Sequence, residues 1–265
     1  MRIIKKVLIV LAVLIVVVVT GAYFLQEKII FLPSKLSQEY VYEFEHDFDE
    51  LFIETEDGAK LNAIHFKKEN PRGIIVYYHG NAGDLSKWGQ ITSHFLQYNY
   101  EVLVMDYRGY GKSTGKLSEE VLYKDAQLMY DKAKELLPDR KVIVYGRSIG
   151  TPIAAYVASK NDPNTLILET PFYNFKKLVK QKAPYVPLGL VKYEFPTADF
   201  ADDVKCRIVI IHGTDDGIVP YESGQQLFMV LPEDRREMVK IEGGKHNDLF
   251  NFQEYNYAIG KELRF

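Results

Sequence analysis

The sequence contains little cysteine and little net charge. Cys206 is the only cysteine among 265 residues, which excludes a small domain held together by disulfides. A net charge of −3 makes the chain a poor candidate for general nucleic-acid binding. Glycine and proline are modest at 18 and 11 residues and 47% of the chain is hydrophobic, which excludes a collagen-like or disordered chain. The length suffices for one large α/β domain with a substantial core.

The longest hydrophobic run lies at the N-terminus. Val7–Leu25 holds 19 residues without a charge, and as a helix it would rise about 28 Å, close to the hydrocarbon thickness of a bilayer. The segment before it, residues 1–6, carries only basic charges, on Arg2, Lys5 and Lys6. This bias favours a cytoplasmic N-terminus and an extracytoplasmic domain. We therefore expect a single-pass transmembrane signal-anchor helix over residues 7–25.

A cleaved signal peptide is the alternative for the same segment. Thr20-Gly21-Ala22 would be a passable small-residue cleavage site. The apolar run continues past that site through Leu25, which suits an anchor better. Either interpretation exports the domain.

Beyond a linker over residues 26–50, strand-like and helix-like segments alternate through residues 51–265. Leu51–Thr55 and Lys60–Phe66 are predicted to pair as a hairpin around Asp57-Gly58. Helical spacing between the later strand-like segments predicts an α/β fold, in which helices cover both faces of a mainly parallel sheet. The six later apolar runs are Gly73–Tyr78, Tyr100–Met105, Lys141–Tyr145, Thr165–Leu168, Arg207–Ile211 and Met238–Ile241.

Residues 171–200 interrupt this alternation. The segment is rich in aromatic residues and holds four prolines, at positions 171, 184, 187 and 196. Long irregular segments inside a compact domain are usually functional. We predict that this one forms a lid over the carboxyl edge of the sheet.

A Gly-x-Ser-x-Gly motif, Gly146-Arg147-Ser148-Ile149-Gly150, lies directly between a predicted strand and a predicted helix. This is the setting of a nucleophile elbow. The serine there stands on a sharp, strained turn, and side chains two residues away would collide with the packed strand and helix. Ser148 is therefore the candidate nucleophile, and a base must take its proton. The alternative is an ordinary helix N-terminus capped by the serine.

Six histidines compete for the role of that base. In a fold of this kind the chain order is serine, acid, histidine, and only His212 and His246 follow Ser148. His246 lies in a glycine-rich loop between the last predicted strand and the last predicted helix, so we predict that it is the base. His212 ends a strand and is predicted to be structural. Three others are predicted bystanders: His46, His65 and His94.

The acid that orients the imidazole has three candidates. Asp215 and Asp216 follow the predicted strand Arg207–Ile211, and Glu169 follows the strand before it. A carboxylate at any of these strand ends would lie at the same sheet edge as Ser148.

An oxyanion hole needs two N–H groups aimed at the developing negative charge. Ile149, which follows the nucleophile, is expected to supply one of them. Asn81, in the small-residue loop after Gly73–Tyr78, is expected to supply the other.

These motifs resemble the α/β-hydrolase superfamily, and most closely its membrane-anchored ABHD-type and yeast BEM-like serine hydrolases. The resemblance covers roughly Tyr40 to Phe265. It implies an eight-stranded-type sheet and a catalytic trio of Ser148, Asp216 and His246, because the family acid stands three residues after the glycine of a His-Gly pair. Cys206-Arg207 departs from the family pattern, which has proline before that strand. Five segments carry the resemblance: Tyr78–Gly83, Asp106–Ser113, Gly146–Gly150, Glu169–Phe172 and His212–Asp216.

The resemblance implies a membrane-anchored serine hydrolase that cleaves ester or thioester bonds through an acyl-enzyme. Carboxylesterases, lysophospholipases and thioesterases are the implied classes, with no cofactor and no metal. Two alternatives are a serine peptidase or acyl-peptide hydrolase of the same fold, and a non-catalytic membrane-tethered binding module. Gly111-Lys112-Ser113 echoes a phosphate loop, but Asp106 stands where that motif needs glycine, which argues against nucleotide binding.

The expected partners are a small ester or lipid-like substrate and, through the N-terminal helix, a membrane. Neither nucleic acid nor an obligate protein partner is expected. Four lysines of the lid segment could hold an anionic head group, although a solvated helix face accounts for them equally well. They are Lys176, Lys177, Lys180 and Lys182.

Overall fold

The computed structural model describes residues 2–264, and the side chains of all of these except positions 12, 15, 16, 18, 22 and 202. Its centre is an eight-stranded sheet with the strand order β10-β9-β8-β7-β4-β6-β3-β2. β3 runs antiparallel to both of its neighbours, and the other adjacent pairs are parallel. The strands are β2 Phe48–Glu54, β3 Lys60–Phe66, β4 Gly73–Tyr78, β6 Glu101–Met105, β7 Lys141–Arg147, β8 Thr165–Glu169, β9 Arg207–Gly213 and β10 Arg236–Ile241.

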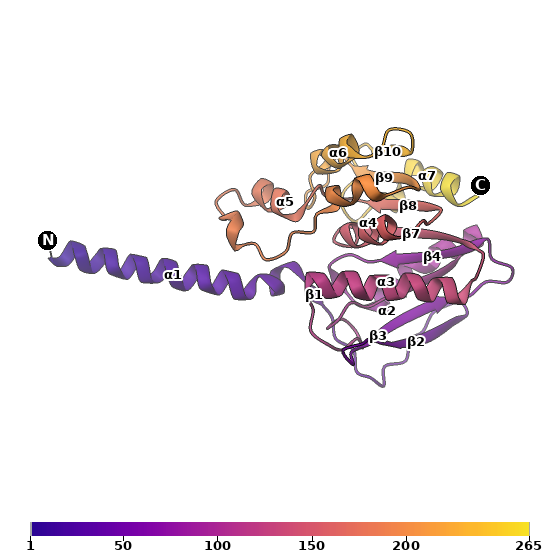
Figure 1. Cartoon of the computed structure of the whole chain (residues 1–265), viewed down its shortest axis with the longest axis horizontal. Coiled ribbons are helices and arrows are strands. Elements are labelled where there is room, and N and C mark those ends of the chain that lie inside the picture. The colour runs from indigo at the N-terminus through magenta and orange to yellow at the C-terminus, as the bar shows by residue number, and fades with distance from the viewer. Residues whose placement is uncertain (1, 265) are drawn as a thin grey trace.

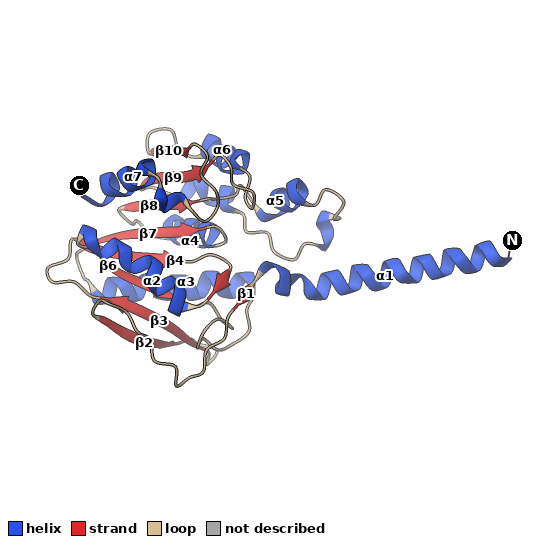
Figure 2. Ribbon diagram, turned by 180° about the vertical axis from the view of Figure 1, so that it is seen from behind, coloured by secondary structure: helices blue, strands red, loops and turns tan. Residues whose placement is uncertain are grey.

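Helices cover both faces of this sheet, as predicted (Figures 1 and 2). Alternate residues of β4 show the consequence: Ile74 and Val76 join the core on one face, and Ile75 and Tyr77 join the core on the other. Burial on both faces explains why these strands are nearly continuous apolar runs in the sequence. The first face is covered by α3 Glu119–Leu136, α4 Gly150–Lys160 and α6 Tyr221–Val230, and the second by α2 Leu85–Ser93 and α7 Gln253–Arg264.

The predicted hairpin is confirmed. β2 and β3 pair from Phe48 opposite Phe66 to Glu54 opposite Lys60. Gly58 makes the turn with a φ of +80°, a left-handed conformation that costs glycine little because it has no Cβ.

The N-terminal segment forms α1, a helix over Arg2–Ile30 that projects from the domain (Figure 1). Its described apolar side chains are largely exposed, with Leu8 at 59% and Phe24 at 68%. Within the part of the chain that the structure describes, no helix has the length and apolar character needed to cross a membrane. The predicted span, residues 7–25, includes five positions whose side chains lie outside the described set.

The segment predicted as a linker, residues 26–50, is folded against the domain over part of its length. Leu32–Pro33 forms β1, which pairs in parallel with β5, Ala82–Gly83. Phe31 is buried and packs edge-on against Tyr193, with ring centroids 5.1 Å apart. Part of the predicted linker is therefore packed on the domain through its apolar residues and backbone groups.

The segment predicted as a lid contains α5, Phe175–Lys182, and two short 3-10 helices, Leu188–Leu190 and Thr197–Asp203. It lies at the same edge of the sheet as the C-terminal end of α1 (Figure 2). Gln26 joins the two segments, because its Nε2 donates to the carbonyl of Leu190 at 3.1 Å and its Oε1 accepts from the backbone N–H of Lys192 at 2.8 Å.

Candidate active site

Ser148 stands at the turn between β7 and α4. Its φ is +54°, in the left-handed region that residues with a Cβ rarely adopt. Both flanking glycines are needed, because a Cβ at Gly146 would lie 2.5 Å from the carbonyl oxygen of Gly150, and a Cβ at Gly150 would lie 2.0 Å from that of Tyr78. The backbone N–H of Ser148 donates to the carbonyl of Glu169 at 2.9 Å. The strained turn expected from the motif is therefore present.

His246 lies between Ser148 and Asp216. Its Nε2 is 3.1 Å from Oγ of Ser148, and its Nδ1 is 2.7 Å from Oδ2 of Asp216. The three residues expose only 8%, 9% and 6% of their surface, respectively. Because Nδ1 faces a carboxylate, it carries the ring proton, which leaves Nε2 to accept the serine hydroxyl. These are the contacts that a general base and its nucleophile require.

Hydrogen bonds join the loop of His246 to the loop of Asp216. The backbone N–H of Asp215 donates to the carbonyl of Gly244 at 3.0 Å, and the backbone N–H of Gly243 donates to Oγ1 of Thr214 at 2.8 Å. The two chains approach so closely that a Cβ on Gly213 would lie 2.1 Å from the carbonyl oxygen of Gly244. The glycines at these positions permit that approach.

The structure separates the three acid candidates. Asp215 is exposed. Glu169 points elsewhere, because its carboxylate lies 3.2 Å from Nε of Arg147 and accepts from the hydroxyl of Tyr145 at 2.6 Å. Asp216, the acid implied by the family pattern, is the one of the three that lies against the imidazole.

Asp216 is held in its ionised form by its neighbours. Burial acts to raise its pKa, but hydrogen bonds from His212, from His246 and from the backbone outweigh burial and hold the pKa below its usual range. The backbone N–H groups of Ile218 and Val219 both donate to Oδ1 at 2.8 Å. A carboxylate held in this way can orient the imidazole and stabilise its charged form.

The two residues predicted to bind an oxyanion lie on loops near the serine turn. Among the described residues, the backbone N–H groups of Asn81 and Ile149 have no hydrogen-bond acceptor. The carbonyl of Asn81 accepts from the backbone N–H of Leu32 at 2.9 Å and from the hydroxyl of Tyr110 at 2.8 Å. Its Nδ2 donates to the carbonyl of Ile30 at 3.1 Å. The end of α1 and the start of β1 therefore hold the loop that carries Asn81.

The predicted bystander histidines lie away from these contacts. His65 is buried and its Nε2 lies 2.7 Å from the carboxylate of Glu101. His46 and His94 are exposed.

Two further side chains, those of His212 and Arg147, contact Asp216 and His246, and the sequence did not predict either contact. Nε2 of His212, which the sequence analysis expected to be structural, lies 3.4 Å from Oδ2 of Asp216. Nη2 of Arg147 lies 3.1 Å from the carbonyl oxygen of His246. Its place inside the Gly-x-Ser-x-Gly motif was the available signal, but nothing in the motif indicates the direction of that side chain.

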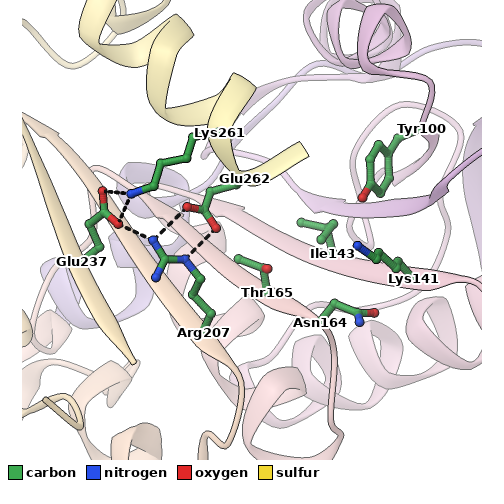
Figure 3. A pocket seen from close by; sticks show the side chains of 9 residues that line it. All are labelled: Tyr100, Lys141, Ile143, Asn164, Thr165, Arg207, Glu237, Lys261 and Glu262. Atoms are coloured by element: carbon green, nitrogen blue, oxygen red, sulfur yellow. Dashed lines mark hydrogen bonds and ion pairs between the residues drawn. The ribbon is translucent and has the colours of Figure 1, made fainter. Parts of the chain in front are cut away.

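A hollow of about 470 Å³ lies at the opposite edge of the sheet, by the amino ends of β7, β8 and β9 (Figure 3). Four of its charged side chains form ion pairs with one another: Arg207 with Glu262 at 2.8 Å, and Lys261 with Glu237 at 2.7 Å. Serine, cysteine and histidine are absent from the residues that line it. The candidate nucleophile Ser148 thus lies outside this hollow.

Comparison with known proteins agrees with this architecture. Residues 69–198 match the family model described as serine aminopeptidase, S33. The chain is 33% identical over 186 residues to the alpha/beta hydrolase domain-containing protein aho-3 of Caenorhabditis elegans, an alignment that covers 68% of this chain and 54% of that protein. It is 30% identical over 187 residues to the lysophosphatidylserine lipase ABHD12 of Bos taurus, covering 61% and 46%. The chain thus spans about half the length of these two relatives.

Among solved structures, the esterase Pf2001 of Pyrococcus furiosus is similar with a TM-score of 0.70. The superposition covers 89% of this chain and 97% of the esterase at 16% identity, so the likeness concerns the fold. The strand order, the strained serine turn and the sequence relatives agree with that fold. The chain belongs to the α/β-hydrolase superfamily.

Proposed function

We propose that the protein is a serine hydrolase that cleaves carboxylic ester or thioester bonds. The 3.1 Å approach of Ser148 Oγ to Nε2 of His246, with Asp216 on the other side of the ring, carries this proposal. A binding module has no physical need for a serine held in a strained conformation opposite a base. The names of the lysophosphatidylserine lipase and the esterase support a hydrolase that acts on acyl esters.

The proposed reaction has two halves. Ser148 Oγ attacks the acyl carbonyl carbon while Nε2 of His246 takes the hydroxyl proton, and the N–H groups of Asn81 and Ile149 bind the resulting oxyanion. The C–O or C–S bond to the leaving group then breaks, and His246 returns the proton to the departing alcohol or thiol. Water attacks the acyl-serine with the same base, which releases the carboxylic acid and restores Ser148.

A fluorophosphonate probe tests the nucleophile directly. We expect the full-length protein to be labelled at Ser148, and the Ser148→Ala variant to lose both labelling and ester hydrolysis. Ser159→Ala, at the far end of α4, is the matched control and should retain both. Undiminished labelling of Ser148→Ala would exclude this serine as the nucleophile. A folded wild-type protein that takes no label would favour the binding module.

We propose a lipid-like acyl ester as the substrate class. Aromatic side chains in the predicted lid and the four lysines of α5 motivate this choice. Three of the four lysines already have contacts: Lys176 with Glu194, Lys177 over the ring of Tyr173 at 3.4 Å, and Lys182 with the carbonyl of Gly217. An anionic head group would therefore compete with these contacts or meet Lys180.

A substrate panel decides between the classes. It combines lysophospholipids, p-nitrophenyl esters of rising chain length, acyl thioesters and aminopeptidase substrates, with the last included because of the family model's description. A rise in kcat/KM with chain length supports the lipid-like class. Turnover confined to acetyl esters or to peptides would contradict it.

We also propose that α1 attaches the domain to a membrane, with residues 1–6 cytoplasmic and the domain extracytoplasmic. The uncharged sequence of residues 7–25 and the basic residues before it support this proposal. Alkaline carbonate extraction should leave the full-length protein in the membrane pellet, with its N-terminal residues detectable by mass spectrometry. A mature N-terminus near Tyr23 would instead indicate signal-peptide cleavage, and extraction of an uncleaved chain would contradict anchoring.

A further inference from the structure

Arg147 is a buried arginine that the hydrolytic mechanism above leaves without a role. Its side chain is 8% exposed, and its Nε lies 3.2 Å from Oε1 of Glu169, whose side chain is 5% exposed. Its Nη2 donates to two groups of another loop, the carbonyl of His246 and Oδ1 of Asn247, both at 3.1 Å. The guanidinium carbon also lies 5.4 Å from the ring centre of Trp88. This cation therefore contacts β8, the loop of His246 and α2.

Glu169, the partner of Arg147, contacts the nucleophile turn through its backbone. Its carbonyl accepts the backbone N–H of Ser148 at 2.9 Å. Its carboxylate is held by the hydroxyl of Tyr145 at 2.6 Å, and that hydroxyl lies 3.1 Å from the hydroxyl of Tyr255. One ion pair, Arg147 with Glu169, thus reaches the serine on one side and the histidine loop on the other.

We propose that Arg147 is a positioning residue that sets the distance between the base and the nucleophile. The inference rests on the proposed function. Arg147 precedes Ser148 in the chain, so its Cα moves with the serine turn, while its guanidinium binds the main chain of His246. The planar guanidinium holds its Nε and Nη2 donors in a fixed geometry, so it transmits position better than a flexible ammonium. Without this link, the loop of His246 would keep its hydrogen bonds to the Thr214–Asp215 segment and the contact of His246 with Asp216, but it would lose its connection to the serine motif through Arg147.

The test compares Arg147→Met and Arg147→Lys with the wild-type protein on one short p-nitrophenyl ester. A loosened base lowers the rate of the chemical step without changing substrate contacts, so we expect kcat to fall by about 100-fold in Arg147→Met while KM changes little. Arg147→Lys keeps a cation beside Glu169, but a single ammonium cannot contact both the carboxylate of Glu169 and the carbonyl of His246 as the guanidinium does. Its kcat should therefore fall by about 10-fold.

Arg108 offers a matched control for the loss of a buried arginine. Its side chain is 5% exposed and is bonded to Asp125 through Nε at 2.8 Å and Nη2 at 2.9 Å, without contact to the loops of Ser148 or His246. Arg108→Met should therefore lower thermal stability while kcat of the folded fraction stays at the wild-type value. A merely structural role for Arg147 predicts the same behaviour for both arginines.

Three outcomes decide the proposal. A fall in kcat for the Arg147 variants alone supports positioning. The proposal is overturned if folded Arg147→Lys has the kcat of the wild-type protein, or if only its KM changes. If Arg147→Met does not fold, the kinetics of Arg147→Lys decide the question. Failure of the wild-type protein to react with a fluorophosphonate would instead count against the proposed function, so the two failures are distinguishable.

Discussion

His212 shares the carboxylate of Asp216 with His246. Its Nε2 lies 3.4 Å from the same oxygen, Oδ2, that lies 2.7 Å from Nδ1 of His246. Nε2 of His212 also lies 3.0 Å from the carbonyl oxygen of Val219, so this nitrogen must carry the proton. The ring is fully buried, and a Cβ on Gly224 would lie 2.3 Å from its Nδ1. The tightly packed imidazole of His212 is thus a second N–H donor to the carboxylate of Asp216.

Removal of the His212 donor should weaken catalysis without abolishing it. His212→Leu deletes an N–H that faces a charged acceptor, and we expect kcat to fall by about 10-fold. His212→Gln, which can place an N–H near the position of Nε2, should recover part of the loss. Steady-state kinetics on a short ester checks both variants. Equal activity of His212→Leu and wild type would show that the backbone donors suffice.

Asp216→Asn should cost far more activity than the same change at the neighbouring exposed acid. The amide cannot stabilise an imidazolium and favours the wrong tautomer of His246, so we expect kcat to fall by about 10³- to 10⁴-fold. Asp215→Asn is the matched control and should leave kcat unchanged, because Asp215 is exposed. A large loss in the control variant instead would reassign the acid.

Asp216 should also make stability depend on pH in the acidic range. Its hydrogen bonds hold its pKa below that of the unfolded chain, so ionised Asp216 stabilises the fold above about pH 4 and this contribution disappears as the pH falls below that value. Urea unfolding of wild type and Asp216→Asn should therefore show a stability difference at pH 6 that narrows at pH 3. A difference independent of pH would contradict the depressed pKa.

The backbone hydrogen bond from Leu32 in β1 to the Asn81 loop should support catalysis, because it holds the loop that carries a proposed oxyanion donor. Leu32→Pro removes the N–H that donates to the carbonyl of Asn81 at 2.9 Å. Leu32→Ala keeps that N–H and removes only a side chain that is 49% exposed. We expect the proline variant to lose about 10-fold in kcat through a loosened oxyanion loop, and the alanine variant to match wild type. Similar kinetics for both variants would show that the hydrogen bond from Leu32 to the Asn81 loop does not affect catalysis.

Thiol reagents should not inhibit the proposed ester hydrolysis. Burial raises the pKa of Cys206 to about 12, so this thiol stays protonated and unreactive at neutral pH. Iodoacetamide should leave ester hydrolysis intact under conditions in which a fluorophosphonate abolishes it. Inactivation by iodoacetamide of the native protein would point to a thiol near the reaction centre.

The hairpin at Gly58 and the turn at Ser148 were predictable from sequence because both depend on residues only a few positions apart. The glycines two residues before and after the serine indicate a lack of space for side chains at those positions, and the structure shows the clashes that a Cβ would cause. Two-sided burial of the central strands was predictable for the same reason, since it leaves a continuous apolar run. The packing of Leu32–Pro33 on the Asn81 loop was not, because two residues carry no periodicity.

The parts of the candidate site that the sequence did not predict depend on contacts between distant segments. The pairing of His246 with Asp216 crosses 30 residues, and that of Arg147 with the carbonyl of His246 crosses 99. The residues alone left three carboxylates open as the acid, and only the family resemblance implied Asp216. Nothing in the serine motif states that its arginine will turn toward the histidine. Those choices depend on how loops from different strands meet at the carboxyl edge of the sheet, and on which charges find a partner once water is removed.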